Sequence, residues 1–326
     1  MRRRDLITLL GGAAAWPFAA RAQQPAMPVV GFLYPASPDT IADRLRGLRQ
    51  GLKDIGYVEG ENVAIEYRWS DGQFDRLPAL ASELVRRQVV VIAAGNLASA
   101  LAAKAATTTI PIVFAVGEDP VRFGLVANLA RPGSNLTGIN FLNVDVTTKR
   151  LMFLRGLVPG ATRVAVLVNP TNDPVAELTL RDVAEAARAL GLQIQVLNAG
   201  TSGEIDAAFA AFARERPEGL FVSGDALFTG RRVQLTTAAA YHAVPATYSA
   251  RAFTEVGGLM SYGANVPDAY RQVGIYIGRI LKGATPAELP VVQASKFELV
   301  INAQTAKTMG LTVPPSLLAL ADEVIE

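Results

Sequence analysis

The chain has 326 residues, half of them hydrophobic, with no cysteine, one histidine (His242) and a formal net charge of +2. The absence of cysteine excludes disulfides, thiolate nucleophiles and cysteine-ligated metals, and a single histidine cannot build a multi-histidine metal centre. We therefore expect neither a metal nor another cofactor.

The first 22 residues have the pattern of an export signal. Arg2–Arg4 precede an apolar run over residues 6–15, which is shorter than the roughly 20 residues of a membrane span. Residues 20–22 (Ala-Arg-Ala) place small side chains where a signal peptidase cleaves, and residues 3–7 (RRDLI) fit a twin-arginine pattern. We predict that residues 1–22 are a signal peptide, with the twin-arginine route favoured over general export, and that the mature protein is periplasmic.

Removal of this segment changes the charge balance. Its four arginines and one aspartate carry a net charge of +3, so the formal charge falls from +2 to −1. A nearly neutral chain has no electrostatic footprint for nucleic acid. There is no second long apolar run and no cysteine at the cleavage site, so we expect neither membrane insertion nor a lipid anchor on cysteine.

Short apolar runs alternate with helical patterns along the rest of the chain, which predicts parallel β-sheets covered by helices. The alternation begins again after about residue 160. The predicted strands are residues 28–34, 63–69, 89–93 and 110–115, and then 163–168, 193–197, 219–222 and 258–262. We interpret the chain as two similar, doubly wound α/β lobes, with a link near residues 142–147.

Polar residues follow several predicted strands of the first half. In such sheets ligands bind beyond the carboxyl ends of the strands, and two facing lobes form one cleft there. Ser37 follows the first strand, Asn96 the third and Asp119 the fourth. Each is a candidate ligand contact or a plain helix cap, and Asp119 before Pro120 has the typical cap pattern.

The second half offers a similar set of candidates. Asn169 and Asn172 follow one predicted strand and Asp225 follows another. An acidic side chain there suits a ligand ammonium or hydroxyl group, or again caps a helix. Tyr248 and Tyr262 are expected near the same edge, where a ring can cover an apolar part of a ligand or pack in the core.

Catalytic motifs are missing from the sequence. It has no G-x-S-x-G, P-loop, H-E-x-x-H or strand-associated G-x-G-x-x-G motif, and nothing near His242 suggests a serine partner. We therefore expect a binding protein rather than an enzyme.

Two stretches, "IPIVFAVGEDPVRFGLVANLARPGSNLTGI" and "KFELVINAQTAKTMGLTVPPSLLALADEVIE", resemble the ABC-transporter substrate-binding family that includes tryptophan- and tyrosine-uptake proteins. The resemblance implies a type I periplasmic-binding-protein fold, a cleft that closes on its ligand, and delivery to a membrane permease driven by an ATPase. The sequence has Asn96-Leu97 and Arg122-Phe123 where such proteins often have Thr-Pro and Gly-Thr, so the resemblance does not assign the ligand.

In type I folds the chain crosses between the lobes three times. On this basis we assign residues 28–142 and about 264–286 to lobe 1, and residues 143–263 and about 287–326 to lobe 2, joined by a hinge. The second crossing is expected near residues 263–266 and the third in the segment "GATPAELPVV".

The resulting hypothesis is a monomeric solute-binding protein that captures an amino acid or an aromatic or carboxylate compound. Ser37 and nearby helix-start N–H groups would hold a carboxylate, Asp225 an amino or hydroxyl group, and Tyr248 or Tyr262 an apolar part. Two alternatives remain open at this point, a ligand-sensing module that acts with a partner receptor and an exported α/β enzyme.

Overall fold

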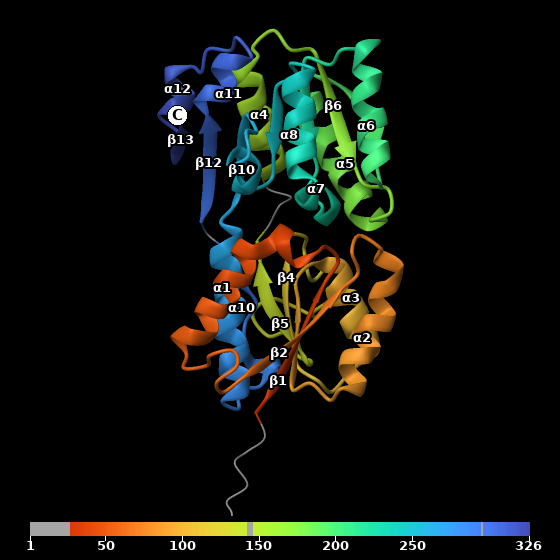
Figure 1. Cartoon of the computed structure of the whole chain (residues 1–326), viewed down its shortest axis with the longest axis vertical. Helices are drawn as coiled ribbons and strands as arrows, with labels where there is room; N and C mark the ends of the chain where they lie inside the picture. The colour runs from red at the N-terminus through yellow and green to blue at the C-terminus, as the bar shows by residue number, and fades with distance from the viewer. Residues whose placement is uncertain (1–26, 142–145, 295) are drawn as a thin grey trace, which may run out of the picture.

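The computed structural model describes residues 27–141, 146–294 and 296–326. The predicted signal peptide, residues 1–22, and most of the predicted link at residues 142–147 lie outside this part. The described chain forms two α/β lobes stacked end to end (Figure 1). Within the described ranges, no helix is long and apolar enough to cross a membrane.

Lobe 1 is built on a six-stranded parallel sheet with the order β11-β5-β4-β3-β1-β2. Its strands are β1 (Val29–Tyr34), β2 (Ala64–Trp69), β3 (Val91–Ala94), β4 (Ile112–Val116), β5 (Leu136–Asn140) and β11 (Val292–Gln293). Strands β3, β4 and β5 are buried along their whole length, as expected where helices cover both faces of a parallel sheet.

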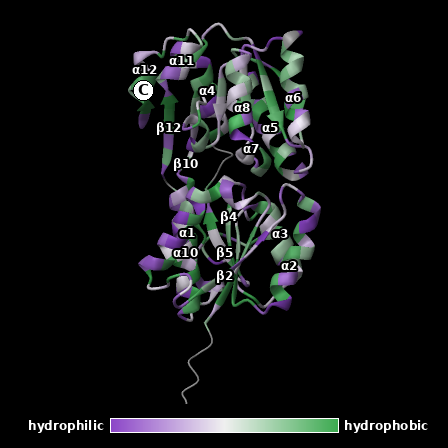
Figure 2. Cartoon of the chain, viewed as in Figure 1, coloured by the Kyte–Doolittle hydropathy of each residue, from purple (hydrophilic) through white to green (hydrophobic). Residues whose placement is uncertain are grey.

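Four helices cover this sheet. One face packs against α1 (Ala42–Asp54) and α10 (Val266–Leu281), and the other against α2 (Leu77–Arg86) and α3 (Leu97–Ala106). The central strands are hydrophobic, whereas hydrophilic residues gather on the outer helices (Figure 2). The apolar residues at the predicted periodic positions of these helices therefore pack on the sheet.

Helices α1 and α10 are far apart in the sequence but pack backbone against backbone. A Cβ atom on Gly51 would lie 1.8 Å from the carbonyl oxygen of Arg271, and one on Gly274 would lie 2.2 Å from that of Leu48. Both distances are far inside van der Waals contact, so only glycine permits this approach. The crossing ties the returning segment of the chain to lobe 1.

Lobe 2 is built on a seven-stranded sheet with the order β13-β12-β10-β9-β8-β6-β7. Its strands are β6 (Arg163–Val168), β7 (Gln193–Asn198), β8 (Gly219–Val222), β9 (Ala246–Tyr248), β10 (Met260–Ala264), β12 (Phe297–Asn302) and β13 (Glu323–Ile325). All pairs are parallel except β10 with β12.

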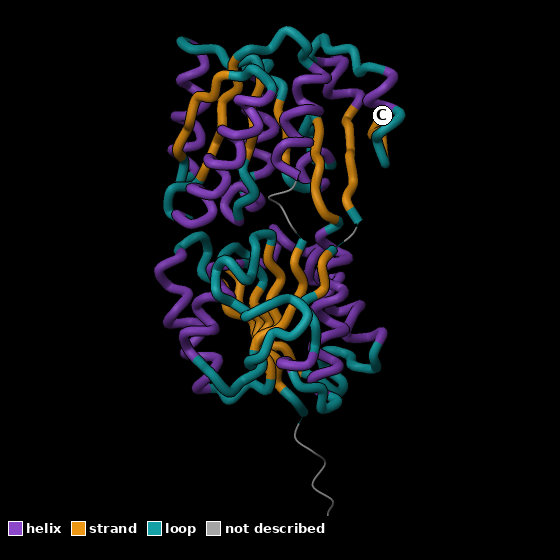
Figure 3. The backbone as a smooth tube through the Cα atoms, turned by 180° about the vertical axis from the view of Figure 1, so that it is seen from behind, coloured by secondary structure: helices purple, strands orange, loops and turns teal. Residues whose placement is uncertain are grey.

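The helices of lobe 2 also lie on both faces of their sheet. One face packs against α4 (Thr147–Leu157) and α5 (Asp173–Ala189). The other helices are α6 (Ser202–Ala210), α7 (Ala226–Gly230), α8 (Arg232–Tyr241), α9 (Arg251–Thr254), α11 (Ala303–Thr308) and α12 (Pro315–Leu318). Seen from behind, helices flank the strands in both lobes (Figure 3).

The prediction of two α/β lobes with parallel sheets is confirmed, and lobe 2 adds one antiparallel pairing, between β10 and β12, so that β12 and β13 run opposite to the other strands. The structure corrects one boundary. Residues from about 287 onward were assigned to lobe 2, but β11 pairs with β5 in the sheet of lobe 1. Because Val292 and Gln293 hydrogen-bond as a sheet-edge strand, the chain leaves lobe 1 only after that pairing, and it enters lobe 2 at β12.

The arrows of β5 and β6 in Figure 1 point toward the boundary between the lobes. The carboxyl ends of the parallel strands therefore face each other across this boundary. Loops and helix starts from both lobes meet there, as the sequence predicts for a ligand cleft.

Candidate functional site

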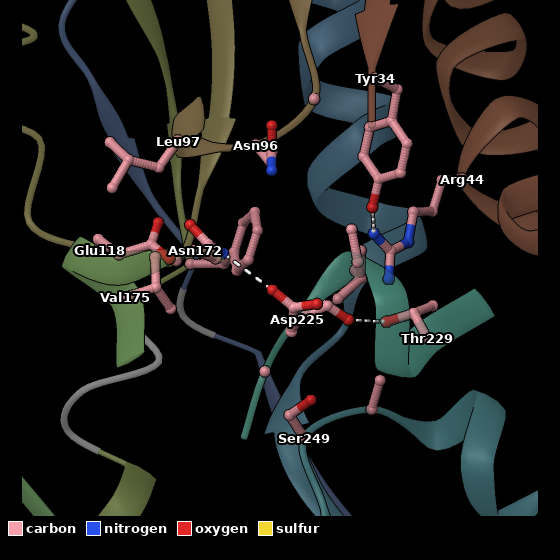
Figure 4. Close-up of a pocket in the computed structure, with 17 residues that line it drawn as sticks. Tyr34, Arg44, Asn96, Leu97, Glu118, Asn172, Val175, Asp225, Thr229 and Ser249 are labelled. Atoms are coloured by element: carbon pink, nitrogen blue, oxygen red, sulfur yellow. Dashed lines mark hydrogen bonds between the residues drawn. The ribbon is translucent and has the colours of Figure 1, made fainter. Parts of the chain in front are cut away.

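A cavity of about 70 Å³ lies between the two lobes. Its wall on the lobe 1 side comes from the ends of β1, β3 and β4 and from α1, and its wall on the lobe 2 side from the ends of β8 and β9 and from α5 and α7. Figure 4 shows that polar side chains from both lobes point into the same space. This is the location expected for a ligand site between two facing α/β sheets.

Arg44 provides a positive charge on the lobe 1 wall. It stands in the first turn of α1, lines the cavity and donates a hydrogen bond to the hydroxyl oxygen of Tyr34 at the end of β1. Its guanidinium carbon lies 5.7 Å from the ring centre of Tyr34 and 5.9 Å from that of Tyr270. Among the residues that the structure describes, no carboxylate lies within 4.0 Å of Arg44. Its charge is therefore available to an anion in the cavity.

Gly95 allows the Tyr34 ring to take this position. A Cβ atom at Gly95 would lie 2.4 Å from Cδ2 of Tyr34 and 2.7 Å from the hydroxyl oxygen of Tyr270. The Tyr270 hydroxyl donates a 2.6 Å hydrogen bond to the carbonyl oxygen of Gly95. Gly95, after β3, therefore allows the loop to pack directly against the rings of Tyr34 and Tyr270, which lie next to Arg44.

Glu118 is an acidic group on the same lobe. It follows β4 directly and lines the cavity. Burial raises the pKa of its carboxyl group to about 7, the backbone N–H groups of Glu118 and Gly117 oppose this shift, and the nearby Asp225 adds to it. The group therefore changes charge near neutral pH, and its charged form favours a cationic neighbour.

Asp225 is a second acidic group and belongs to lobe 2. One carboxylate oxygen accepts hydrogen bonds from Nδ2 of Asn169 at 3.1 Å and from the backbone N–H of Leu227 at 2.8 Å. The other oxygen accepts from Nδ2 of Asn172 at 2.9 Å. Burial raises the pKa of Asp225, and these hydrogen bonds oppose the rise. The carboxylate is thus held rigidly and faces the cavity.

The charged groups are arranged along the cavity rather than paired with each other. In Figure 4, Asp225 lies between Arg44 on one side and Glu118 on the other. Leu97, Phe141 and Val175 add apolar surface to the lining. The site therefore combines one cation, two acids and an apolar wall, a set that complements a zwitterion with a hydrophobic side chain.

The lobes also touch each other directly around the cavity. Nη1 of Arg232 in α8 donates a 3.3 Å hydrogen bond to the carbonyl oxygen of Thr40 in lobe 1. Ala226 and Val175 of lobe 2 are buried within hydrophobic clusters of lobe 1. The structure is therefore that of lobes in contact, and separation of the lobes would break these contacts and expose the cavity.

Three of the eight candidate residues from the sequence, Asn96, Asn172 and Asp225, line the cavity. Oδ1 of Asn96 also caps α3 by accepting a 2.9 Å hydrogen bond from the backbone N–H of Ser99. Asn169 is buried behind Asp225 and holds it in place. Of the two sequence departures noted above, Asn96-Leu97 belongs to the lining, whereas Arg122-Phe123 lies outside it.

Four candidates lie elsewhere. Ser37 precedes the 3₁₀ helix at Pro38–Ile41 and is not part of the lining, and its side chain makes no capping hydrogen bond within the described chain. Asp119 is exposed, and its Oδ1 accepts from the backbone N–H groups of Val121 and Arg122. It acts as the cap that the Asp-Pro pattern indicates, and this turns its side chain away from the cavity.

The two tyrosines expected at the cleft edge are in the interior of lobe 2. Tyr248 is fully buried and stacks on Phe253 with ring centres 4.6 Å apart. Tyr262 packs between Phe153 and Phe297, and its hydroxyl accepts a 3.3 Å hydrogen bond from Nζ of Lys149. Tyr248 and Tyr262 belong to hydrophobic clusters of lobe 2, as expected for strand residues of a sheet whose two faces are both covered by helices.

Sequence reasoning missed several residues of the lining. The main ones are Tyr34, Arg44, Glu118, Thr229 and Ser249. Glu118 had a signal, since it stands between a predicted strand and the Asp-Pro cap. Arg44 had no comparable signal, because its position on an amphipathic helix is equally compatible with a solvent-exposed face.

The fold and this cavity are those of a two-lobed binding protein with a candidate ligand site at the lobe boundary. A family model described as "ABC transporter substrate binding protein" matches residues 29–325, and the chain belongs to this family. It is a family of solute-binding proteins rather than of enzymes. No cluster of three or more metal-ligating side chains occurs in the part of the chain that the structure covers.

Three known proteins are similar to this chain. A tyrosine-binding protein of Clostridioides difficile is 26% identical over 267 residues, which cover 82% of this chain and 76% of that protein. The structure of a conserved domain protein from Vibrio cholerae is 28% identical with a TM-score of 0.83. An ABC domain from Streptococcus pneumonia in complex with L-Trp is 25% identical with the same TM-score. Both structural matches cover 91% of this chain and 99% of the other.

Proposed function

We propose that this protein is a periplasmic, monomeric and non-catalytic carrier that captures an amino acid with an apolar or aromatic side chain and delivers it to an ABC permease and its ATPase. The observation that carries the proposal is the placement of Arg44 from lobe 1 and Asp225 from lobe 2 in one cavity. The relatives described as binding tyrosine and tryptophan support the same ligand class.

In this proposal Arg44 binds the α-carboxylate of the ligand. A guanidinium group forms charge-assisted hydrogen bonds with a carboxylate, and its planar fork suits bidentate contact. Arg44 takes the role that the sequence analysis gave to Ser37, which stands outside the cavity lining.

The α-ammonium group lies near Asp225 and Glu118. Asp225 keeps its carboxylate oriented through three hydrogen bonds, and Glu118 adds a second acid from the opposite lobe. The ammonium group reduces the unfavourable interaction between the two acids, which is largest when the lobes are together. The ligand thus favours the closed arrangement because it contacts both lobes there.

The test is calorimetry with the chain lacking residues 1–22. L-Tryptophan, L-tyrosine and L-phenylalanine are compared with phenethylamine, which lacks the carboxylate, and 3-phenylpropionate, which lacks the ammonium group. We expect the amino acids to bind much more tightly than either analogue. Equal binding of phenethylamine and phenylalanine would refute the carboxylate contact, and no binding of any amino acid would refute the ligand class.

Arg44→Gln is the matching variant, and Arg46→Gln on the same helix is its control, since Arg46 is exposed and is not in the cavity lining. Loss of a charged hydrogen bond predicts roughly 10- to 100-fold weaker amino-acid binding for Arg44→Gln. The affinity for phenethylamine should not change. Arg46→Gln should bind all ligands as the wild type does.

Periplasmic location, monomeric state and delivery are separate parts of the proposal. Cell fractionation tests export, and light scattering on the mature chain tests whether it is a monomer. Ligand-dependent stimulation of the reconstituted permease–ATPase complex tests delivery. Stimulation without added amino acid, or none with it, would contradict the transport role.

A further inference from the structure

Helix α7 of lobe 2 lies directly against lobe 1. Ala226, at its start, belongs to a hydrophobic cluster whose other buried members are residues of lobe 1. Gly230, at its end, faces Thr40 in the 3₁₀ helix of lobe 1, since a Cβ atom on Gly230 would lie 3.5 Å from Cγ2 of Thr40. Both ends of α7 therefore meet lobe 1, and separation of the lobes breaks both contacts.

Arg232, at the start of α8, connects the two lobes beside this contact. Its Nη1 donates hydrogen bonds to the carbonyl oxygen of Thr40 in lobe 1 at 3.3 Å and to that of Thr229 in lobe 2 at 3.1 Å. A guanidinium group stays charged in proteins, and charged donors form stronger hydrogen bonds than neutral ones. One nitrogen atom thus joins a carbonyl group of each lobe. Arg232 is not part of the cavity lining.

A chain of hydrogen bonds leads from Arg232 to the ligand cavity. Asp225, the acid of the proposed ammonium site, is the N-cap of α7. Oγ1 of Thr229 donates a 2.9 Å hydrogen bond to the carbonyl oxygen of Asp225, and the carbonyl oxygen of Thr229 accepts from Arg232 (Figure 4 shows the first of these). Asp225 and Thr229 both line the cavity, so one short helix carries the ligand contact and the lobe contact. Connected hydrogen bonds on a rigid element can couple two sites energetically.

We propose that Arg232 is a positioning residue that holds the two lobes together over the bound ligand, and that the contact of Arg232 and Gly230 with Thr40, the interlobe clasp, sets how long the ligand stays bound. The inference rests on the proposed function, in which the ligand lies between the lobes and leaves when they separate. Because Arg232 lies outside the cavity lining, it contributes equally to the binding of every ligand. Arg44 differs in this respect, since it recognises a carboxylate.

The first test is Arg232→Gln, with Arg231→Gln as the control for the loss of one charge. Arg231 is the preceding residue, is exposed and is not in the cavity lining. We expect Arg232→Gln to weaken the binding of L-phenylalanine and of phenethylamine by the same factor, about three- to tenfold, through faster dissociation in stopped-flow displacement. Arg231→Gln should bind both ligands as the wild type does.

Two results of this comparison would overturn the proposal. Weaker binding of phenylalanine alone would mean that Arg232 recognises the ligand carboxylate. A lower unfolding temperature with both affinities unchanged would mean that Arg232 only stabilises the fold.

A cross-link at the same place is the second test. A Cβ atom on Gly230 would lie 4.0 Å from Cβ of Thr40, within the range of about 3.5–4.5 Å found in disulfides. The natural chain has no cysteine, so the double variant Thr40→Cys/Gly230→Cys can form one intramolecular disulfide and no other. When it is oxidised with phenylalanine bound, we expect release at least about tenfold slower than from the reduced form, because the lobes must separate first.

The two single-cysteine variants are the controls and should release the ligand at the same rate with and without oxidant. Equal release from the oxidised and reduced forms of the double variant would overturn the proposal, and so would failure of the folded double variant to form the disulfide. If the double variant does not fold, the comparison of phenylalanine with phenethylamine in Arg232→Gln decides the question.

The rate of disulfide formation needs no ligand and separates this inference from the proposed function. In the double-cysteine background, Arg232→Gln should slow disulfide formation about three- to tenfold relative to Arg231→Gln, measured by mass spectrometry of quenched samples. If this difference is found but no amino acid binds, the clasp stands and the proposed ligand is refuted. If amino acids bind but Arg232→Gln changes neither their affinity nor the cross-linking rate, the clasp is refuted and the amino-acid site stands.

Discussion

Glu118→Gln tests the electrostatics of the lobe boundary. Burial, with a further contribution from Asp225, raises the pKa of Glu118 from 4.5 to about 7 in the contacting lobes. A shift of about 2.5 units corresponds to roughly 3 kcal/mol, because one unit is about 1.4 kcal/mol. At high pH the ionised Glu118 side chain therefore destabilises the folded state with contacting lobes by up to about 3 kcal/mol.

The sign of the pH dependence follows from linkage. The pKa is higher in the folded, contacting lobes than in the unfolded chain, so the favourable contribution is complete below about pH 4.5 and is lost as the pH rises through about 7. Glu118→Gln removes this dependence. We expect its unfolding temperature without ligand to equal that of the wild type at pH 4.5 and to exceed it by several degrees at pH 8.

The assay is thermal unfolding of the mature protein at half-unit steps from pH 4.5 to 8.5. Glu61→Gln is the control, because Glu61 is exposed and should leave the wild-type curve unchanged. Parallel curves for Glu118→Gln and the wild type would refute the reasoning. Because a ligand ammonium group favours the ionised form of Glu118, amino-acid binding at pH 6 should also release up to about 0.9 proton, measured by calorimetry in buffers of different ionisation enthalpy.

Two further predictions concern binding and packing. Asp225→Ala should weaken amino-acid binding by about 1.5–3 kcal/mol in calorimetry, because a charged hydrogen bond is lost, and an unchanged affinity would remove Asp225 from the site. Gly51→Ala should lower the free energy of unfolding by about 1–3 kcal/mol in urea titrations, since its Cβ would lie 1.8 Å from the Arg271 carbonyl oxygen. Gly156→Ala in α4, where no atom lies within 4 Å of the added Cβ, is the control and should be neutral or stabilising by up to about 1 kcal/mol.

Most of the architecture could be predicted from the sequence, because it depends on local patterns. The apolar runs at residues 28–34 and 163–168 became β1 and β6, and the alternation with helices predicted two parallel sheets. The placement of β11 could not be predicted in this way. A strand of two residues has no periodicity of its own. Its pairing with β5 depends on the tertiary packing of α10, which returns the chain to lobe 1 before β11.

The site could be predicted only in part, because the sequence marks the loops after the strands but not the cavity-facing residues of the helices. This rule found Asn96, Asn172 and Asp225, whose backbone positions alone bring them to the cavity. It failed for Tyr248 and Tyr262, since both stand within strands of a sheet whose two faces are covered by helices, and a strand side chain on either face enters the core. The position of a residue near a strand end therefore shows that its backbone lies close to the cavity. It does not show whether the side chain points into the cavity or into the core.

Arg44, the cation of the proposed ligand site, stands on a helix, and its role depends on the counter-ion that it lacks within the described chain. Arg44 lies near the phenol groups of Tyr34 and Tyr270, but no described carboxylate is within 4.0 Å of it. The amino-acid sequence shows thirty-one cationic side chains and does not show which of them remain without a counter-ion after folding. Pairing is a property of the tertiary structure, and a cation left unpaired at the lobe boundary is complemented when a ligand supplies the missing acceptor. For this reason the comparison of phenylalanine with phenethylamine, rather than a stability measurement, is the decisive test for Arg44.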